Sequence, residues 1–349
     1  MSTPTLNPRA VIDGAVAAGE IPGAVAIYGT ATTIQAPIAA GFRRLDGPAT
    51  TPDTRYDLAS LTKVVSTLPC VLRLLTDGAV RLDDPVRRFI SNAGWFQSPS
   101  LGDATIRELL THTAGLPAWE PLYTRTNDRL VGLGAALQTA RPNIGQVVYS
   151  DLGFIVLGAI IERVCGQRQD AFLREVVLDP MGMAETGYGP AGPPVAATEN
   201  CGWRTCVLEG VVHDENAYAL GGVAGHAGLF GTAGDLAAYC QAWLRGDPRL
   251  GDPGLLAKAR SEQATGPGVR RALGWLLKGE GSFAGPAASL QGYGHTGFTG
   301  TSLWIEPDAG WFAVLLTNRV HPHRSGGPNI QQIRRDFHHA VGARRQEID

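Results

Sequence analysis

Apolar residues recur at the spacing of an α-helix between residues 61 and 75. The apolar positions are Leu61, Val64, Val65, Leu68, Val71, Leu72 and Leu75. Steps of three and four residues place side chains on one face of a helix, and Gly78 follows as a stop signal. We therefore predict a long core helix. Pro69 lies within it and should kink it, because proline lacks a backbone N–H.

The two ends of the chain favour β-strands instead. Near the start, residues 23–28 and 33–40 form short apolar runs separated by a Gly-Thr turn. Near the end, residues 300–306 and 311–318 flank a Pro-Asp-Ala-Gly turn, which predicts a hairpin. An amphipathic helix rich in arginine is expected at about residues 330–341.

The middle of the chain alternates helical segments with loops rich in glycine and proline. The helical segments are Thr105–His112, Leu130–Thr139, Asp151–Cys165 and Asp170–Leu178. Strands at both ends with helices between them predict an α+β fold, in which an antiparallel sheet is flanked by helices. We expect one domain over residues 1–349, with an α/β part at about 8–75 plus 225–345 and an inserted helical subdomain at about 76–224. A cleft between the two parts is a natural place for a site.

Composition limits the class of protein. The 349 residues carry 30 basic and 32 acidic side chains, whereas a nucleic-acid binder would normally show a basic excess. The N-terminal residues lack a basic region followed by an apolar stretch, so no secretory signal is visible. The longest apolar run, Phe154–Ile161, is far shorter than the ~20 residues that span a membrane. With five scattered cysteines and no export signal, we expect a cytoplasmic protein that binds neither nucleic acid nor membrane.

Lysine is scarce in this chain. Only three of the 30 basic residues are lysines, namely Lys63, Lys258 and Lys278, and codon bias explains the arginine excess itself. Lys63 differs from the other two because Ser60 stands three residues before it. Residues three apart share a helix face, so the amine can meet the hydroxyl and take the proton of a serine nucleophile. The alternative is a serine N-cap followed by a surface lysine.

Two further short motifs carry polar groups suited to acyl transfer. Tyr149-Ser150-Asp151 precedes an apolar helix, and a phenol beside a lysine can move a proton. Alternatively, Asp151 is only the N-cap of that helix. His295-Thr296-Gly297 stands before the C-terminal hairpin, where glycine lets a substrate approach an edge strand closely. Alternatively, this tripeptide is an ordinary turn.

In this order the three motifs resemble those of the serine β-lactamase and penicillin-recognising hydrolase superfamily. That group carries Ser-x-x-Lys, then Tyr-x-Asn, then Lys-Thr-Gly or a variant that begins with His. Longer segments are similar to its esterase and D-aminopeptidase relatives: DLASLTK (57–63), LLTHTAGLP (109–117), YSDLGFIVLG (149–158), PMGM (180–183), GGVAGHAGLF (221–230) and GHTGFTGTSLW (294–304). The resemblance covers residues 8 to 340, approximately, and implies a β-lactamase/DD-peptidase-like fold.

The resemblance also implies a role for each motif. Ser60 would be the acylated nucleophile, Lys63 its partner base, and Tyr149 the shuttle that carries the proton to the leaving group. The backbone N–H groups of Ser60 and Phe298 would form the oxyanion hole. An acyl-enzyme would form, water would hydrolyse it, and no cofactor would be needed. The residues implied in binding the substrate or the oxyanion are Asp151, His295, Thr296, Gly297 and Phe298.

Two positions depart from the commoner motifs of this superfamily. Asp151 replaces Asn, and His295 replaces the Lys that attracts a substrate carboxylate. Histidine is mostly neutral near pH 7 and an added aspartate repels an anion, so both changes favour a neutral ester or a substrate with a free amine. We also hypothesise that Asp151 holds Lys63 protonated and leaves Tyr149 as the working base.

No metal site is expected. None of the eight histidines has His-Glu-x-x-His spacing, and no paired cysteines have zinc-site spacing. We expect His338 and His339 on a surface helix. The chain also lacks a phosphate loop and a Gly-x-Ser-x-Gly elbow. The residues whose roles stay open are His112, His213, His226 and Arg319.

The sequence therefore favours a serine hydrolase that forms an acyl-enzyme on Ser60, most of all a carboxylesterase of small esters. The first alternative is a D-aminopeptidase or amidase in which Asp151 receives the substrate ammonium. A β-lactamase or DD-carboxypeptidase follows. A non-catalytic binding protein that retains the fold would usually have lost Ser60 or Lys63. The expected partner is a small ester or amide, and the oligomeric state is left open.

Overall fold

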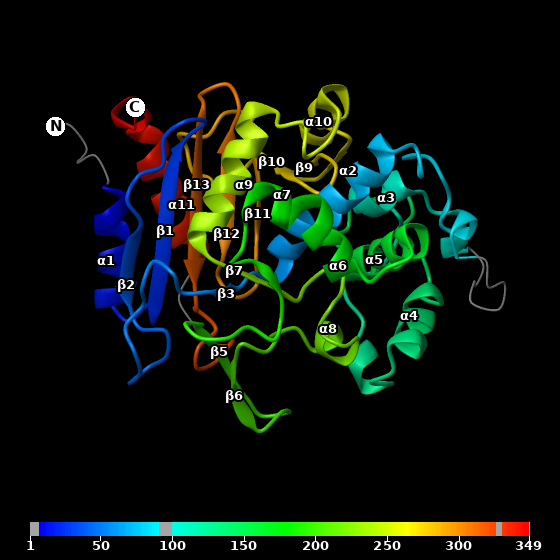
Figure 1. Ribbon diagram of the computed structural model, residues 1–349, viewed down its shortest axis with the longest axis horizontal. Coiled ribbons are helices and arrows are strands. Elements are labelled where there is room, and N and C mark those ends of the chain that lie inside the picture. Colours follow the sequence, from blue (N-terminus) through cyan, green and yellow to red (C-terminus); the bar gives the residue numbers. More distant parts are fainter. Residues whose placement is uncertain (1–6, 91–99, 326–329, 349) are drawn as a thin grey trace.

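The protein is built around one large antiparallel sheet. The computed structural model describes residues 7–90, 100–325 and 330–348 (Figure 1). The eight strands of the sheet follow the order β2-β1-β13-β12-β11-β10-β9-β8. In that order their bounds are Ile38–Gly41, Gly23–Thr30, Trp311–Thr317, Ser302–Glu306, Tyr293–Thr296, Leu276–Leu277, Val269–Arg271 and Ala264–Gly266. Because β1 pairs with β13, the two ends of the chain share one sheet, as predicted.

The C-terminal hairpin is confirmed, whereas one N-terminal strand is shorter than predicted. β12 and β13 pair from Ser302↔Leu315 to Glu306↔Trp311. Every residue of both strands is buried, which explains their continuous apolar runs. The strand expected over residues 33–40 begins only at Ile38, because Pro37 has no N–H to donate to a neighbouring strand.

Helices cover both faces of this sheet. α1 (Pro8–Ala17) and α11 (Ile330–Ala343) pack on one face and against each other. α9 (Ala233–Arg245) covers the other face against β1 and β13, as Figure 1 shows. The Thr232 side chain caps the start of α9, and Gly246 ends it with a left-handed backbone. The α+β architecture with helices flanking an antiparallel sheet is therefore confirmed.

A mostly helical region lies on the side of α9 away from α1 and α11 (Figure 1). Its helices are α3 (Ile106–Leu110), α4 (Arg129–Leu137), α5 (Asp151–Cys165), α6 (Gln169–Leu173), α7 (Asp179–Met181) and α8 (Glu215–Ala219). The four predicted helical segments are observed here with small shifts at their ends, and residues 174–178 are π-helical. α10 (Pro253–Arg260) leads into β8. The limits of a helical subdomain stay a prediction.

Two small sheets accompany these helices. The first has the strand order β3-β7-β4, formed by Tyr56–Asp57, Leu229–Gly231 and Gly187–Tyr188. The second is the hairpin of β5 (Ala197–Cys201) and β6 (Cys206–Glu209). The first sheet matters for function, because β3 leads directly into the turn that carries Ser60.

The predicted core helix consists of three successive helical forms. A 3₁₀ turn at Ala59–Leu61 leads into a π-helix at Lys63–Thr67 and then into α2 at Leu68–Thr76. The irregularity expected at Pro69 thus lies in the turn before it, where the wide π spacing accompanies the missing proline N–H. Over the described residues, the window 59–76 alone is long and apolar enough to cross a membrane, and 78% of it is buried inside the structure.

Candidate active site

Ser60 stands on an unusual turn that a buried carboxylate holds in place. Just before it, Ala59 has a left-handed backbone with φ 46°, which is uncommon for a residue other than glycine. The Asp57 carboxylate accepts hydrogen bonds from the N–H of Ala59 at 2.8 Å and from that of His213 at 2.6 Å. Burial raises the pKa of Asp57, and these two N–H donors oppose the rise. The carboxylate therefore holds the backbone that presents Ser60.

Lys63 lies behind Ser60 with three acceptors around its amino group. Its Nζ is 2.9 Å from Ser60 Oγ, 2.7 Å from Asp151 Oδ1 and 3.2 Å from the carbonyl oxygen of His226. Burial by itself lowers the pKa of Lys63, but Asp151 and Tyr149 outweigh burial, so that this pKa is raised. Three acceptors for three N–H groups agree with the hypothesis of a protonated Lys63.

Asp151 begins α5, and its side chain reaches Lys63. The N-cap of this helix is Ser150, whose Oγ donates to the Pro117 carbonyl at 2.7 Å. The alternative reading of Asp151 as the N-cap is therefore wrong. A carboxylate in the first turn lies at the positive end of the helix dipole, and this carboxylate pairs with Lys63.

The Tyr149 ring lies among four basic or imidazole side chains. Lys63 Nζ and Arg271 Cζ are 4.9 and 5.4 Å from its centroid. The ring centroids of His112 and His295 are 4.7 and 5.9 Å away. Burial raises the pKa of Tyr149, while Lys63 acts to lower it. Because the result is a raised pKa, Tyr149 is a phenol at neutral pH in the free protein.

The strand β11 carries the third motif. His295 is buried, and its Nδ1–H donates to the Thr296 carbonyl at 2.8 Å. Burial holds the pKa of His295 well below its ordinary value, and the positive charges of Arg271 and Lys63 lower it further. His295 is thus neutral at pH 7, which agrees with the sequence-based expectation.

Two threonines tie the end of β11 to the segment before Ser60. Thr299 Oγ1 donates to the Asp57 carbonyl at 2.7 Å, and Thr301 Oγ1 donates to the Leu58 carbonyl at 3.1 Å. A Cβ at Gly297 would lie 2.1 Å from Thr301 Oγ1 and 2.5 Å from the Leu58 oxygen. Only glycine fits this close approach of the two segments.

This approach leaves two backbone N–H groups suited to an oxyanion. Within the described ranges, the N–H groups of Ser60 and Phe298 have no backbone acceptor. Arg334 steadies the loop from the far side by donating to the carbonyls of Gly297 at 2.6 Å and Thr301 at 2.9 Å. Donors fixed in advance are what stabilise a developing negative charge in acyl transfer.

The site opens into a cavity of about 280 Å³. Its wall is formed by Ser60, Tyr149, Arg271, Leu276, His295, Thr296 and Phe298. Lys63 and Asp151 lie behind Ser60, and Gly297 lies between two of the lining segments. The structure therefore brings together every site residue predicted from the sequence, while their catalytic roles stay a prediction.

Phe298 is half exposed at the rim of this cavity, between His213 and Arg319. The His213 ring stacks on it at a centroid distance of 5.6 Å, and the Arg319 guanidinium is 5.0 Å from its centroid. Arg319 also donates to the Phe298 carbonyl from Nε at 3.1 Å and from Nη2 at 3.0 Å. Two residues whose roles the sequence left open thus hold Phe298.

The other two open residues support the site from behind. His112 Nδ1 accepts a hydrogen bond from the Ser150 N–H at 3.0 Å, which orients the segment of the second motif. His226 Nε2 is 2.8 Å from Asp214 Oδ1, and the His226 carbonyl accepts from Lys63. Neither histidine lines the cavity, so both act through their neighbours.

Sequence reasoning missed Arg271 and misplaced His338. Arg271 belongs to no motif, and nothing in residues 264–271 marks it as part of a site. His338 is fully buried, not on the surface, and its Nε2 is 2.9 Å from Ser302 Oγ. It shares the sheet-facing side of α11 with Phe337 and Val341, so the helical period of that segment could have revealed its burial.

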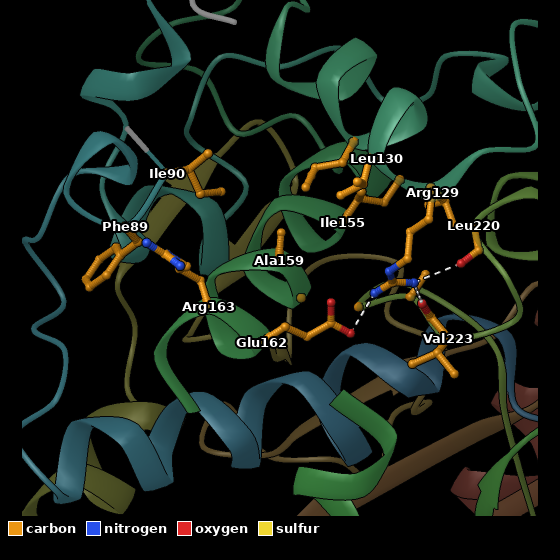
Figure 2. Close-up of a pocket in the computed structure, with 14 residues that line it drawn as sticks. Phe89, Ile90, Arg129, Leu130, Ile155, Ala159, Glu162, Arg163, Leu220 and Val223 are labelled. Carbon is orange, nitrogen blue, oxygen red and sulfur yellow. Dashed lines mark hydrogen bonds and ion pairs between the residues drawn. The ribbon is translucent and has the colours of Figure 1, made fainter. Parts of the chain in front are cut away.

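A second cavity, of about 450 Å³, lies in the helical region (Figure 2). Apolar side chains such as Leu130 and Ile155 line it, and its described lining includes no serine, cysteine or histidine. Figure 2 shows Arg129 reaching Glu162, at 2.6 Å, together with the carbonyls of Leu220 and Val223. Nowhere in the described ranges do three His, Cys, Asp or Glu side chains gather as a metal site.

Comparisons with known proteins show what this chain is similar to. The model of the family described as Beta-lactamase matches residues 8–336. The "Putative D-alanyl-D-alanine carboxypeptidase" of Escherichia coli (strain K12) is 32% identical over an alignment that covers 91% of this chain and 79% of that protein. EstCE1, a hydrolase with promiscuous acyltransferase activity, has a TM-score of 0.78 at 22% identity, with 96% of this chain and 97% of that chain covered. The octameric penicillin-binding protein homologue from Pyrococcus abyssi has a TM-score of 0.75 at 20% identity, with 97% and 76% covered.

Proposed function

Because this chain belongs to the beta-lactamase family of serine hydrolases, we propose that it hydrolyses a carboxylic ester or a small amide through an acyl-enzyme on Ser60. The observation that carries the proposal is the 2.9 Å contact between Ser60 Oγ, at the cavity wall, and the buried Lys63 Nζ. A serine hydroxyl is a weak nucleophile until a neighbouring group activates it. Lys63 and Tyr149 are the groups within reach.

Lys63 and Tyr149 divide the proton handling in this proposal. In the active form of the Lys63–Tyr149 pair, one of the two side chains has lost its proton. Lys63 keeps its own, because Asp151, Ser60 and the His226 carbonyl all accept from it, and Tyr149 is then the phenolate. Tyr149 takes the Ser60 proton while Oγ bonds to the substrate carbonyl carbon, and the Lys63 ammonium stabilises the negative charge that develops.

The remaining steps use the same groups. The oxyanion of the tetrahedral intermediate accepts from the N–H groups of Ser60 and Phe298. The intermediate collapses, the bond to the leaving group breaks, and Tyr149 returns its proton to the departing oxygen or nitrogen. Water then attacks the acyl-enzyme with Tyr149 as base, which releases the acid and restores Ser60.

The position of Asp151 argues against the aminopeptidase alternative. Its carboxylate is paired with Lys63, its side chain is 18% exposed, and it does not line the cavity. It therefore offers no free charge to a substrate ammonium. A D-alanyl-D-alanine carboxypeptidase is the second candidate, and the name of the relative that is 32% identical favours it.

Trapping the acyl group tests the proposal. Wild type and Ser60→Ala are incubated with p-nitrophenyl acetate, p-nitrophenyl butyrate, nitrocefin and a peptide that ends in D-alanyl-D-alanine. We expect turnover by wild type only. Trypsin cleaves after Arg55 and after Lys63, so the acyl adduct should be found on the peptide Tyr56–Lys63. Absence of both turnover and adduct would support a binding protein that retains the fold.

A further inference from the structure

Two cysteines stand directly opposite each other in the β5–β6 hairpin (Figure 1). Cys201 is the last residue of β5, Cys206 is the first residue of β6, and the strand register pairs them. Paired residues of antiparallel strands have Cα atoms about 4.5 or 5.5 Å apart, depending on their position in the hydrogen-bond pattern. A disulfide spans Cα distances of about 4.4–6.8 Å. Both thiols are free, so the backbone already has the separation that a disulfide between them requires.

The two thiols differ in their exposure to solvent. Cys206 is exposed, whereas Cys201 is only 3% exposed. The Sγ of Cys201 accepts a hydrogen bond from the Arg204 N–H at 3.4 Å, so this sulfur lies against the turn that joins the two strands. An exposed thiol can attack a disulfide in solution, and a second thiol across the strand can then displace the first product. The pair therefore has the arrangement of an attacking and a resolving cysteine.

The other three cysteines have no such arrangement. All three lie in helices, so no strand register places a second cysteine opposite any of them. Cys70 and Cys240 are fully buried in the core. Cys165 is half-buried, and its Sγ donates to the Gln167 carbonyl at 3.4 Å. Nor do the described residues offer the hairpin cysteines a third His, Cys, Asp or Glu side chain with which to bind a metal.

The hairpin holds His213 from two sides. Arg204, in the turn between the two cysteines, donates to the carbonyls of Val212 and His213 at 2.6 and 2.7 Å. Glu199, two residues before Cys201 on β5, has its carboxylate 3.2 Å from His213 Nε2. Movements of the hairpin end therefore act directly on the position of His213.

His213 in turn contacts two parts of the candidate active site. Its N–H donates to the Asp57 carboxylate at 2.6 Å, and this carboxylate holds the turn that presents Ser60. Its ring stacks on Phe298 at a centroid distance of 5.6 Å. The cysteine pair is thus linked to the active site through a single residue.

We propose that Cys201 and Cys206 are a redox-active dithiol, which low-molecular-weight disulfides such as glutathione disulfide oxidise to a cross-strand disulfide, and that this bond steadies the contacts of the hairpin with His213. The Cys206 thiolate attacks one sulfur of glutathione disulfide, whose S–S bond breaks, and one glutathione leaves as a thiolate that takes up a proton. The Cys201 thiolate then attacks Cys206 Sγ and displaces the second glutathione in the same way. The protein loses two electrons and two protons, and the two glutathione molecules gain them. A dithiol reductant reverses both steps.

Peptide mapping after oxidation tests the site. Folded protein is incubated with glutathione disulfide, the remaining thiols are alkylated, and the product is digested without reduction. Trypsin cleaves after Arg204, and the glutamate-specific protease Glu-C cleaves after Glu199 and Glu209. Each cysteine then lies alone in a short peptide, at residues 200–204 and 205–209, and the proposed disulfide joins these two peptides. We expect the joined peptides from wild type, and dithiothreitol should separate them.

Single substitutions distinguish the two cysteines. Cys201→Ser should stop at the mixed disulfide, with one glutathione on residues 205–209, because the resolving thiol is missing. Cys206→Ser should react much more slowly, because the thiol that remains in the hairpin is buried. The matched control Cys165→Ser should give the joined peptides as wild type does. The site would be wrong if wild type accumulated the glutathione adduct without joined peptides, or formed them only when unfolded in urea.

Hydrogen exchange tests the link to the active site. The His213 N–H, which donates to Asp57, should exchange several-fold more slowly in oxidised than in reduced wild type, because the disulfide restrains the hairpin that holds it. Cys206→Ser treated with the same glutathione disulfide should show no slowing. Exchange of this N–H that oxidation leaves unchanged would overturn the link. All of these measurements are made without substrate, so their outcome is independent of the proposed function.

Discussion

The cavity lined by Ser60 (the catalytic cavity) contains Arg271, and the cavity lined by Leu130 and Ile155 (the helical cavity) contains Arg129 and Arg163. Arg271 and Arg129 stand in opposite surroundings. In the helical cavity, Arg129 pairs with Glu162 and binds two backbone carbonyls, so its charge and its donors are satisfied within the protein (Figure 2). In the catalytic cavity, Arg271 is more deeply buried and finds no acceptor among the described residues. The helical cavity is the larger one, yet its lining offers no nucleophile.

This difference separates an arginine whose partners lie within the protein from one that has no described acceptor for its side chain. Buried polar groups in natural proteins are nearly always hydrogen-bonded, and an exception needs an explanation. Arg129 follows the rule. Arg271 is an exception, and it lines the same cavity as Ser60. Cavity volume alone would have pointed to the wrong site.

The largest expected difference between the two cavities is the effect of substitutions on activity. Lys63→Met and Tyr149→Phe should each lower kcat/KM for p-nitrophenyl butyrate about 10²- to 10⁴-fold, the range for losing a group that handles a proton. Arg163→Met removes a charge from the helical cavity and should leave activity unchanged. Steady-state kinetics on folded protein check this. Near-normal activity of Tyr149→Phe would contradict its role as the base.

The free energy of unfolding should depend on Arg129 of the helical cavity and not on Arg271 of the catalytic cavity. Arg129→Met leaves two carbonyls without their donor and Glu162 with only the Gln169 N–H, so it should lower the free energy of unfolding by about 1–3 kcal/mol. Arg271→Met strands no described acceptor and removes an unpaired buried charge, so it should be neutral or stabilising. Urea unfolding of both variants gives the two values. A larger loss for Arg271→Met would mean that its charge serves the fold.

Sequence motifs located the residues of the candidate site but not the charges around them. Ser60 and Lys63 were found because their spacing along a helix is a local property, which the chain shows directly. The pairing of Lys63 with Asp151 was hypothesised through a resemblance, since those residues are far apart in sequence. Arg271 was out of reach, because its lack of a partner depends on which side of β9 faces the cavity.

The fold, too, has features that the sequence predicted and features that it did not. Apolar runs at both ends of the chain, with segments of helical period between them, predicted the antiparallel sheet and its flanking helices. They did not predict the π-helix at Lys63–Thr67 or the left-handed Ala59. The π-helix lies in the turn before Pro69, where the sequence predicted only a kink. The left-handed Ala59 accompanies a contact with a distant segment, Asp57 accepting from His213, which no local pattern records.

The dependence of kcat/KM on pH tests the roles of Lys63 and Tyr149 in the catalytic cavity. The pKa values of Lys63 and Tyr149 are both raised, so the form that lacks one proton is scarce at neutral pH. We expect kcat/KM to rise with pH through the neutral range and well into the alkaline range. Asp151→Asn removes the charge that opposes the burial of Lys63, so the pKa of Lys63 should fall and the rise should move to lower pH. The profile is measured with an amide substrate, whose background hydrolysis at high pH is slow, and an unchanged profile in Asp151→Asn would contradict this coupling.

The smallest expected effect lies at the rim of the catalytic cavity. Phe298→Leu removes the stacking on His213 and the contact with the Arg319 guanidinium, which together are worth about 1 kcal/mol or somewhat more. Its backbone N–H and the bonds from Arg319 to its carbonyl remain. KM should therefore rise only a few-fold while kcat stays nearly constant. Leu130→Ala, at an exposed position of the helical cavity, should change neither constant. A large fall in kcat for Phe298→Leu would instead show that the ring itself holds the oxyanion donor in place, because a contact that only binds substrate leaves the chemical step intact.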